Sequence, residues 1–146
     1  MLTFDQQGYL KPYEPIETDL ETFEKTFAIS SVRKAIFEQY LAYLSDLQEI
    51  IPNEFYQWID GSFVTKKPLP FDLDVVTFVE NDIYKKNKVK MENIKIKYPK
   101  IDAYFAPLFA NGHPDFFKNH IIKMEWERIY VGNRRLHPKG IIQINF

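Results

Sequence analysis

The sequence contains no cysteine among its 146 residues. Disulfide bonds, cysteine-ligated zinc and a thiol nucleophile are therefore excluded. The N-terminal segment MLTFDQQGYLKPYEP has neither a basic start nor an apolar run, so we expect no signal peptide. Long hydrophobic runs are missing as well, and none approaches the ~20 residues that span a bilayer. We therefore expect a cytoplasmic protein with no membrane partner.

A strong charge of one sign is absent too. Lysine and arginine together number 19, and aspartate and glutamate number 20, which gives a net charge of −1. No overall field attracts the protein to nucleic acid, so nucleic acid is an unexpected partner. Hydrophobic residues make up 45% of the chain and aromatic residues 16%, which argues against disorder. We expect a single domain over residues 1–146, with an extended arm over residues 1–16.

The most informative stretch is residues 58–79, which read WIDGSFVTKKPLPFDLDVVTFV. An apolar run ending at Ile59 meets an Asp-Gly-Ser turn, and nine residues separate Ser62 from Asp72. If the segment from Asp72 onward is a strand, Asp72 and Asp74 project from the same face. Two carboxylates this close take up a proton or hold a cation between them. Hard oxygen ligands on a rigid strand suit Mg²⁺.

The pair Gly61-Ser62 indicates a phosphate site beside these acids. Gly61 permits a tight turn and the close approach of a ligand. Ser62 is a suitable N-cap for a short helix over residues 62–66, and free amides at the start of a helix attract phosphate. The alternative interpretation is a strand–turn–strand unit with a solvated acidic edge.

The order hydrophobic-Gly-Ser, nine residues, Asp-hydrophobic-Asp-hydrophobic resembles the signature of the DNA polymerase β-like nucleotidyltransferase superfamily. The wording WIDGSFVT…DLDVV is most similar to small bacterial members of the minimal nucleotidyltransferase type. The resemblance implies a metal-dependent nucleotidyltransferase, which transfers a nucleoside monophosphate from an NTP, ATP first, to a hydroxyl group. Residues 58–79 carry the signature, which leaves most of the chain outside it.

The same resemblance implies roles for individual residues. Asp72 and Asp74 hold Mg²⁺ or Mn²⁺ ions, which lie about 4 Å apart in two-metal sites. Asp102, on a third strand, completes the carboxylate triad and helps to deprotonate the attacking hydroxyl. The amides of Gly61 and Ser62, with the serine hydroxyl, bind the leaving phosphates.

Four basic residues near the C-terminal strand are further candidates for phosphate contacts: Arg128, Arg134, Arg135 and Lys139. We prefer Lys139, because Gly140 beside it permits a close approach. A lysine-rich stretch over residues 83–100 is either a solvated face or a patch for a polyanion. The three histidines, His113, His120 and His137, lack metal-ligand spacing.

The identity of the acceptor stays open. Small members of the superfamily include antitoxins that modify a partner toxin protein. The resemblance therefore implies a toxin–antitoxin setting with a protein acceptor first and a small molecule second, and a homodimer or hetero-complex. The alternative is a non-catalytic module on the same scaffold that binds a nucleotide or a partner. Metal-dependent turnover of an NTP separates these two functions.

For the fold we expect an α+β arrangement, with a small mixed sheet of about four strands backed by helices. The expected strands cover residues 55–60, 72–79, 101–106 and 141–146, with the last closing one edge of the sheet. The expected helices cover residues 18–27, 31–49, 82–93 and 114–131.

Several local features of these elements are expected as well. Thr18 and Glu21 form a capping box for the first helix. Arg33 and Lys34 are solvated, and Pro107 ends the third strand. The last helix supplies a buried face made of Phe116, Phe117, His120, Ile121, Met124 and Ile129.

Overall fold

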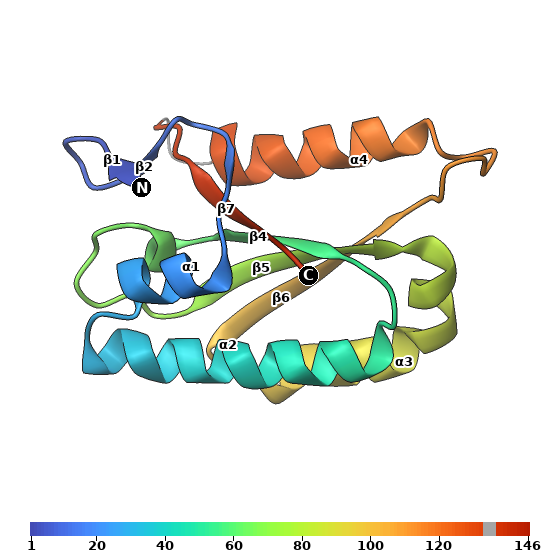
Figure 1. Cartoon of the computed structure of the whole chain (residues 1–146), viewed down its shortest axis with the longest axis horizontal. Helices are drawn as coiled ribbons and strands as arrows, with labels where there is room; N and C mark the ends of the chain where they lie inside the picture. Colours follow the sequence, from blue (N-terminus) through green and yellow to red (C-terminus); the bar gives the residue numbers. More distant parts are fainter. Residues whose placement is uncertain (133–136) are drawn as a thin grey trace.

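The computed structural model describes residues 1–132 and 137–146, and it has the expected α+β architecture (Figure 1). Arg134 and Arg135 lie outside the described residues. Five strands form one mixed sheet in the order β3-β7-β4-β5-β6, and two short strands pair separately. The strands are β1 (Thr3–Phe4), β2 (Leu10–Lys11), β3 (Pro15–Glu17), β4 (Tyr56–Asp60), β5 (Leu73–Glu80), β6 (Ile101–Leu108) and β7 (Ile141–Asn145). The helices are α1 (Leu20–Phe27), α2 (Ser31–Ile50), α3 (Asn81–Lys97) and α4 (Lys118–Glu127), with helical turns η1 (Ser62–Val64) and η2 (Arg128–Gly132).

The sheet lies between two helical layers. Figure 1 shows α1, α2 and α3 on one face of the sheet and α4 on the other. The larger core fills the first side and includes Phe23 and Tyr40, while a smaller core around Trp58 fills the second. Because side chains alternate along a strand, β5 sends Val75 to the larger core and Val76 to the smaller one. The two long helices expected from the sequence thus cover opposite faces.

The N-terminal helices begin at polar caps. Asp19 is the N-cap of α1, and its carboxylate accepts a hydrogen bond from the Thr22 amide at 2.6 Å. The predicted cap at Thr18 is therefore wrong by one residue, because Asp19 caps as well as threonine and is the residue that reaches the third amide of the helix. Ser30 caps α2, with its hydroxyl accepting from the Arg33 amide at 3.2 Å.

The sheet has five strands rather than about four, because the N-terminal arm contributes one. β3 pairs in parallel with β7, so that Ile16 lies opposite Ile142. β7 therefore lies between β3 and β4, and the prediction that residues 141–146 close an edge is wrong. Three residues, beginning with Pro15, are too few for alternation to identify β3 as a strand.

β6 forms the other edge of the sheet and continues through Pro107 to Leu108. Pro107 is paired in register with Val79 of β5. The prediction that Pro107 ends the strand is wrong, because an edge strand tolerates proline where no neighbouring strand needs its N–H group.

α3 and α4 differ in length from the predicted helices. α3 extends to Lys97, and non-helical backbone angles at Asn87 divide it. α4 begins at Lys118 rather than at residue 114, because residues 114–117 form turns. None of the helices in the described ranges is both long enough and apolar enough to cross a membrane.

The face of α4 that was predicted to be buried is exposed. Phe117 is 64% exposed, Ile121 52% and Met124 55%. Ile122 and Trp126 pack against the smaller core instead. α4 carries apolar side chains on two sides, and the side with the large Trp126 ring faces the sheet. The other residues of the predicted face are also exposed, namely Phe116, His120 and Ile129.

Candidate metal and phosphate site

Four aspartates gather on neighbouring strands at the end of the sheet. Asp60 of β4 is paired with Asp74 of β5, which is paired with Asp102 of β6. Residues directly opposite each other point to the same face of a sheet, so these three form a row on the α4 side. Asp72 comes one residue before β5 and shares this face with Asp74.

The three aspartates proposed from the sequence as metal ligands lie together. Asp72, Asp74 and Asp102 each offer one carboxylate oxygen, and these atoms lie within 4.8 Å of one another. Asp72 and Asp74 are half-buried, and Asp102 is exposed. Three hard oxygens at this spacing could hold a metal ion.

Burial and mutual repulsion disfavour the ionised forms of these acids. Burial, followed by the charges of Asp72, Asp60 and Asp102, raises the pKa of Asp74 to about 7, and Lys139 opposes this effect. Burial and the charge of Asp102 raise the pKa of Asp72 as well. A cation bound among these groups would relieve the repulsion.

A buried hydroxyl lies close to the same charges. Tyr130 is 3% exposed, and its hydroxyl has no hydrogen-bond partner among the described residues. Burial and then the charges of Asp60 and Asp74 hold the pKa of Tyr130 well above its usual value. The sequence offered no signal for this proximity, because Tyr130 belongs to η2 and is distant from these aspartates along the chain.

Gly61 is required at the turn for two reasons. Its φ of +87° is in the region that glycine adopts without strain. A Cβ atom at this position would lie 3.0 Å from Asp74 Oδ2. The turn after β4 therefore contacts the central carboxylate of the cluster, which a larger residue would prevent.

The predicted helix over residues 62–66 is shorter than expected. Only Ser62–Val64 form a 3₁₀ turn, and Gly61 occupies the capping position that was assigned to Ser62. The Thr65 amide donates to the Ser62 carbonyl at 3.2 Å, and the Thr65 hydroxyl donates to it at 2.7 Å. A longer helix does not form, because the chain turns toward Pro68 after a single turn.

Arg33 holds the segment after this turn in place. It is 3% exposed, so the prediction that it is solvated is wrong. Its Nη1 donates to the Phe63 carbonyl at 2.7 Å, and its Nη2 donates to the carbonyls of Thr65 and Lys67 at 2.7 and 2.6 Å. Nothing in the local sequence distinguishes Arg33 from the exposed Lys34, because its partners are about 30 residues away.

Lys139 forms an ion pair with one of the four aspartates. Its Nζ lies 2.8 Å from Asp60 Oδ1, which gives Asp60 a role that the sequence did not predict. Gly140 is close to the arm rather than to a ligand, since a Cβ atom there would lie 2.5 Å from the Pro12 carbonyl oxygen. The reason given for preferring Lys139 is therefore wrong, although Lys139 does lie at the site.

A basic cavity opens beside the Gly61-Ser62 turn. It has a volume of about 340 Å³, and three lysines contribute to its lining. The arm forms part of its wall, where Tyr9 is bridged to Thr65. The lining residues are Gln7, Tyr9, Ser62, Thr65, Lys66, Lys67, Pro68 and Lys139. The adjacent Lys66 and Lys67 were a possible signal in the sequence, directly after the turn.

Part of the lysine-rich stretch also approaches the site. Lys100 counteracts the increase in the pKa of Asp72. Lys95 Nζ lies 5.2 Å from the centre of the Tyr104 ring, and the Tyr104 hydroxyl donates to Asp102 at 3.1 Å. The stretch is thus neither wholly solvated nor a continuous patch. Histidine takes no part in the metal-holding group found among the described residues.

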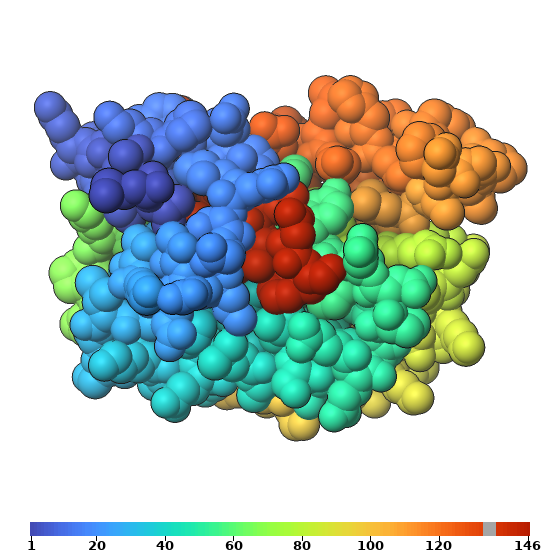
Figure 2. Space-filling model, viewed as in Figure 1, coloured from blue at the N-terminus to red at the C-terminus, as the bar shows by residue number. Residues whose placement is uncertain are grey.

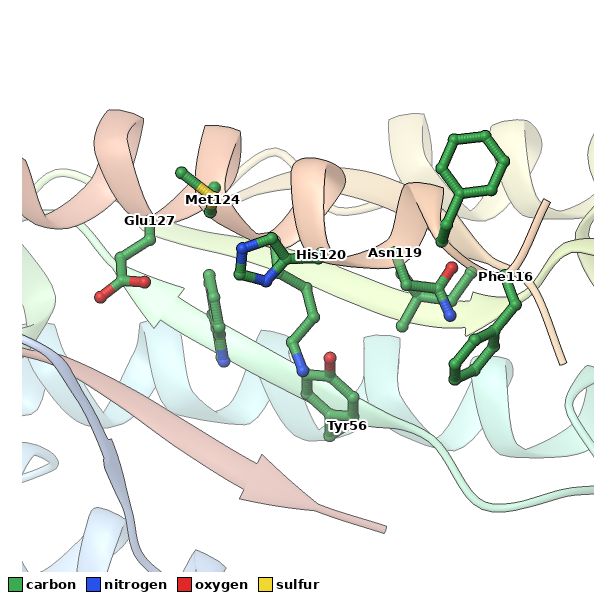
Figure 3. A pocket seen from close by; sticks show the side chains of 10 residues that line it. Tyr56, Phe116, Asn119, His120, Met124 and Glu127 are labelled. Carbon is green, nitrogen blue, oxygen red and sulfur yellow. The ribbon is translucent and has the colours of Figure 1, made fainter. Parts of the chain in front are cut away.

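A second cavity, of about 570 Å³, lies between α4 and the same face of the sheet. Figure 3 shows Tyr56 on the strand side, with His120, Met124 and Glu127 of α4 opposite it. Trp58 lines this cavity two residues before Asp60, so the aromatic cavity and the carboxylate row follow each other along β4.

The profile of DUF6932, described as a family of unknown function, matches residues 2–145. The chain belongs to the DUF6932 family. Searches of curated proteins and of solved structures find no match to this DUF6932 chain.

Proposed function

We propose that this DUF6932 chain is a metal-dependent nucleotidyltransferase. It would transfer a nucleoside monophosphate from an NTP, ATP first, to a hydroxyl group on a protein or small-molecule acceptor. The observation that carries the proposal is the placement of the carboxylates and the basic cavity on two sides of one turn. Gly61 contacts Asp74, while Ser62 lines the cavity.

The carboxylates fit a hard divalent cation. Asp72, Asp74 and Asp102 provide oxygens at a suitable spacing, and their repulsion favours a bound cation over an empty cluster. A divalent cation held there would neutralise charge on the phosphate oxygens. Asp102 is the most exposed of the three and is therefore placed to accept a proton from the acceptor hydroxyl.

The basic cavity fits the leaving phosphates. Lys66, Lys67 and Lys139 all line it, and ammonium groups bind phosphate oxygens. In the transfer, the acceptor oxygen bonds to the α-phosphorus, and the bond from that phosphorus to the bridging oxygen breaks. Pyrophosphate then leaves with its charge balanced by the lysines. Positioning and charge neutralisation supply most of the rate in such reactions.

Two exposed apolar side chains favour a protein as the acceptor. Leu69 is 68% exposed and Phe71 is 71% exposed, and they lie three residues and one residue before Asp72. Lys100 Nζ lies 4.2 Å from the centre of the Phe71 ring. Apolar side chains beside the Lys100 ammonium group suit contact with a protein surface, in a homodimer or a hetero-complex. They suit a polar small-molecule acceptor, such as a sugar, less well.

The proposal is tested with purified protein, each labelled NTP, and Mg²⁺ or Mn²⁺, alone and in cell lysate. We expect wild type to transfer label, and Asp74→Asn to lose roughly 100-fold or more of that activity, because it removes the central metal ligand. Glu54→Gln changes an exposed acid outside the site and should retain activity. Combined Lys66→Gln and Lys67→Gln substitutions should raise KM for the NTP more than they lower kcat.

The same experiment identifies a non-catalytic module. Thermal stabilisation by NTP and metal without transfer, lost in Asp74→Asn, would indicate a nucleotide-binding or antitoxin-type protein. Absence of both transfer and stabilisation would contradict both functions.

A further inference from the structure

The outer side of α4 carries a stripe of exposed apolar side chains. Phe117, Ile121 and Met124 are spaced at i, i+4 and i+7, which places them on one side of a helix. Figure 1 shows α4 (orange) along an outer edge of the molecule with the sheet on its inner side, and in Figure 2 the orange atoms lie at the surface. Among the described residues, this stripe is therefore open to a partner.

The charged residues beside the stripe on one copy are complementary to those on a second copy. Lys118 and Glu125 are seven residues apart, so they lie on the same flank of α4, and both are exposed. Lys118 Nζ also lies 3.3 Å from Asp115 Oδ1 of its own chain, in an exposed pair that contributes little. In an antiparallel pair of α4 helices related by a two-fold axis, residues equally far from the centre face each other. With the centre next to Ile121, Lys118 of one copy faces Glu125 of the second copy, and the reverse pair forms at the same time.

The apolar residues interdigitate in the same arrangement. Ile121 lies at the centre against its own copy, and Met124 of each copy falls between Phe117 and Ile121 of the other. The helix dipoles also oppose each other in an antiparallel pair. The net charge of −1 causes little repulsion between two copies.

We propose that the outer face of α4 is a homodimer interface, in which two copies pack their α4 helices antiparallel around Ile121. Three large apolar residues from each copy form a small interface, below the roughly 1,200 Å² at which stable interfaces begin, so the dimer is a weak one. The dimer is therefore concentration-dependent. Phe117 and Met124 also line the cavity between α4 and the sheet, but none of the three stripe residues belongs to the carboxylate row.

The test is sedimentation velocity of the full chain between roughly 1 and 300 μM, a range that covers micromolar dissociation constants. We expect wild type to change from monomer to dimer across this range. Ile121→Glu should weaken the dimer about 10-fold or more, because it places two like charges at the centre. Val89→Glu is the matched control, since Val89 is 75% exposed on α3 and should leave the dimer unchanged.

The charge pairs are tested by reversal. Lys118→Glu alone and Glu125→Lys alone should each weaken the dimer several-fold, and the two together should restore it to within about twofold of wild type. Circular dichroism confirms that each variant is folded. A wild type that stays monomeric, a dimer that Ile121→Glu leaves intact, or a double reversal that fails to restore association would each overturn the proposal.

Discussion

The fold strongly changes the ionisation of Asp74 in the carboxylate row. It lies in register with Asp60 on one side and Asp102 on the other, and Gly61 closes over its carboxylate. These neighbours, together with burial, raise its pKa to about 7. At neutral pH without metal, the carboxylate row therefore costs stability, and a cation or a proton offsets that cost.

The pH dependence of stability follows from the sign of this shift. The folded pKa of Asp74 is raised from 3.8 to about 7, so the folded state binds more protons than the unfolded state between these values. The stability that this proton provides is complete below pH 4 and is lost as pH rises through 7. In EDTA at pH 8, Asp74→Asn should therefore be more stable than wild type by about 1–2 kcal/mol, a value reduced for partial exposure.

Thermal unfolding from pH 4 to pH 8 measures this difference, which should shrink toward acidic pH. Glu54→Gln serves as the control, because Glu54 is exposed and lies outside the carboxylate row. Mg²⁺ should raise the melting temperature of wild type but not of Asp74→Asn. An equal loss of stability in the variant at every pH would contradict the repulsion described for Asp74.

The segment between β4 and β5 is held in place by the side chain of Arg33, which belongs to the distant helix α2. Arg33 of α2 bonds to three carbonyls of this segment, at Phe63, Thr65 and Lys67, and to the Phe27 carbonyl at 3.2 Å. Its guanidinium also lies 5.2 Å from the centre of the Phe63 ring. Because the segment includes Lys66 and Lys67 of the basic cavity, Arg33 positions a site that it does not line.

We expect Arg33→Met to destabilise the protein by about 3–5 kcal/mol, because it leaves several buried carbonyl groups without donors. Arg33→Lys should recover only part of this loss, since one ammonium group cannot reach all four carbonyls. Chemical denaturation measures the free energy of unfolding. Lys34→Met, at the exposed next position, should change it by less than about 0.5 kcal/mol. Equal effects at the two positions would contradict the role of Arg33.

The N-terminal arm packs against both the sheet and the segment after β4. β3 extends the sheet beside β7, Leu10 is fully buried, and the Lys66 amide donates to the Gly8 carbonyl at 3.0 Å. The Gly140 amide donates to the Leu10 carbonyl at 2.7 Å. In Figure 2 the C-terminal residues (red) lie against the N-terminal segment (blue), which covers part of the last strand. The arm thus completes both the sheet and the wall of the basic cavity.

Gly140→Ala should displace the arm, because the added Cβ atom would lie 2.5 Å from the Pro12 carbonyl oxygen. We expect a loss of about 1–3 kcal/mol and faster proteolytic cleavage within residues 1–13. Gly132→Ala is the matched control, since a Cβ atom there meets nothing within 4 Å. Thermal unfolding and limited proteolysis measure the two effects, and an arm that stays equally protected in both variants would contradict this contact.

The sequence alone determined the local features of the candidate site. The spacing of Gly61, Ser62, Asp72 and Asp74 follows from neighbouring residues, and alternation in the strands fixes which of them share a face. The α+β class and the position of α2 were predictable for the same reason, because their periodicity is local. Asp102 was proposed only through the resemblance, since its place beside Asp74 depends on strand register.

The tertiary structure decided the features that join distant residues. It buried Arg33 while leaving Lys34 exposed, placed β3 beside β7, and turned the Trp126 side of α4 toward the sheet. Each of these outcomes depends on which surface meets the element after the chain has folded, and a short window of sequence does not contain that information. Local spacing thus specified which chemical groups are present, while long-range packing set their environment, their pKa values and the side of α4 that stays exposed.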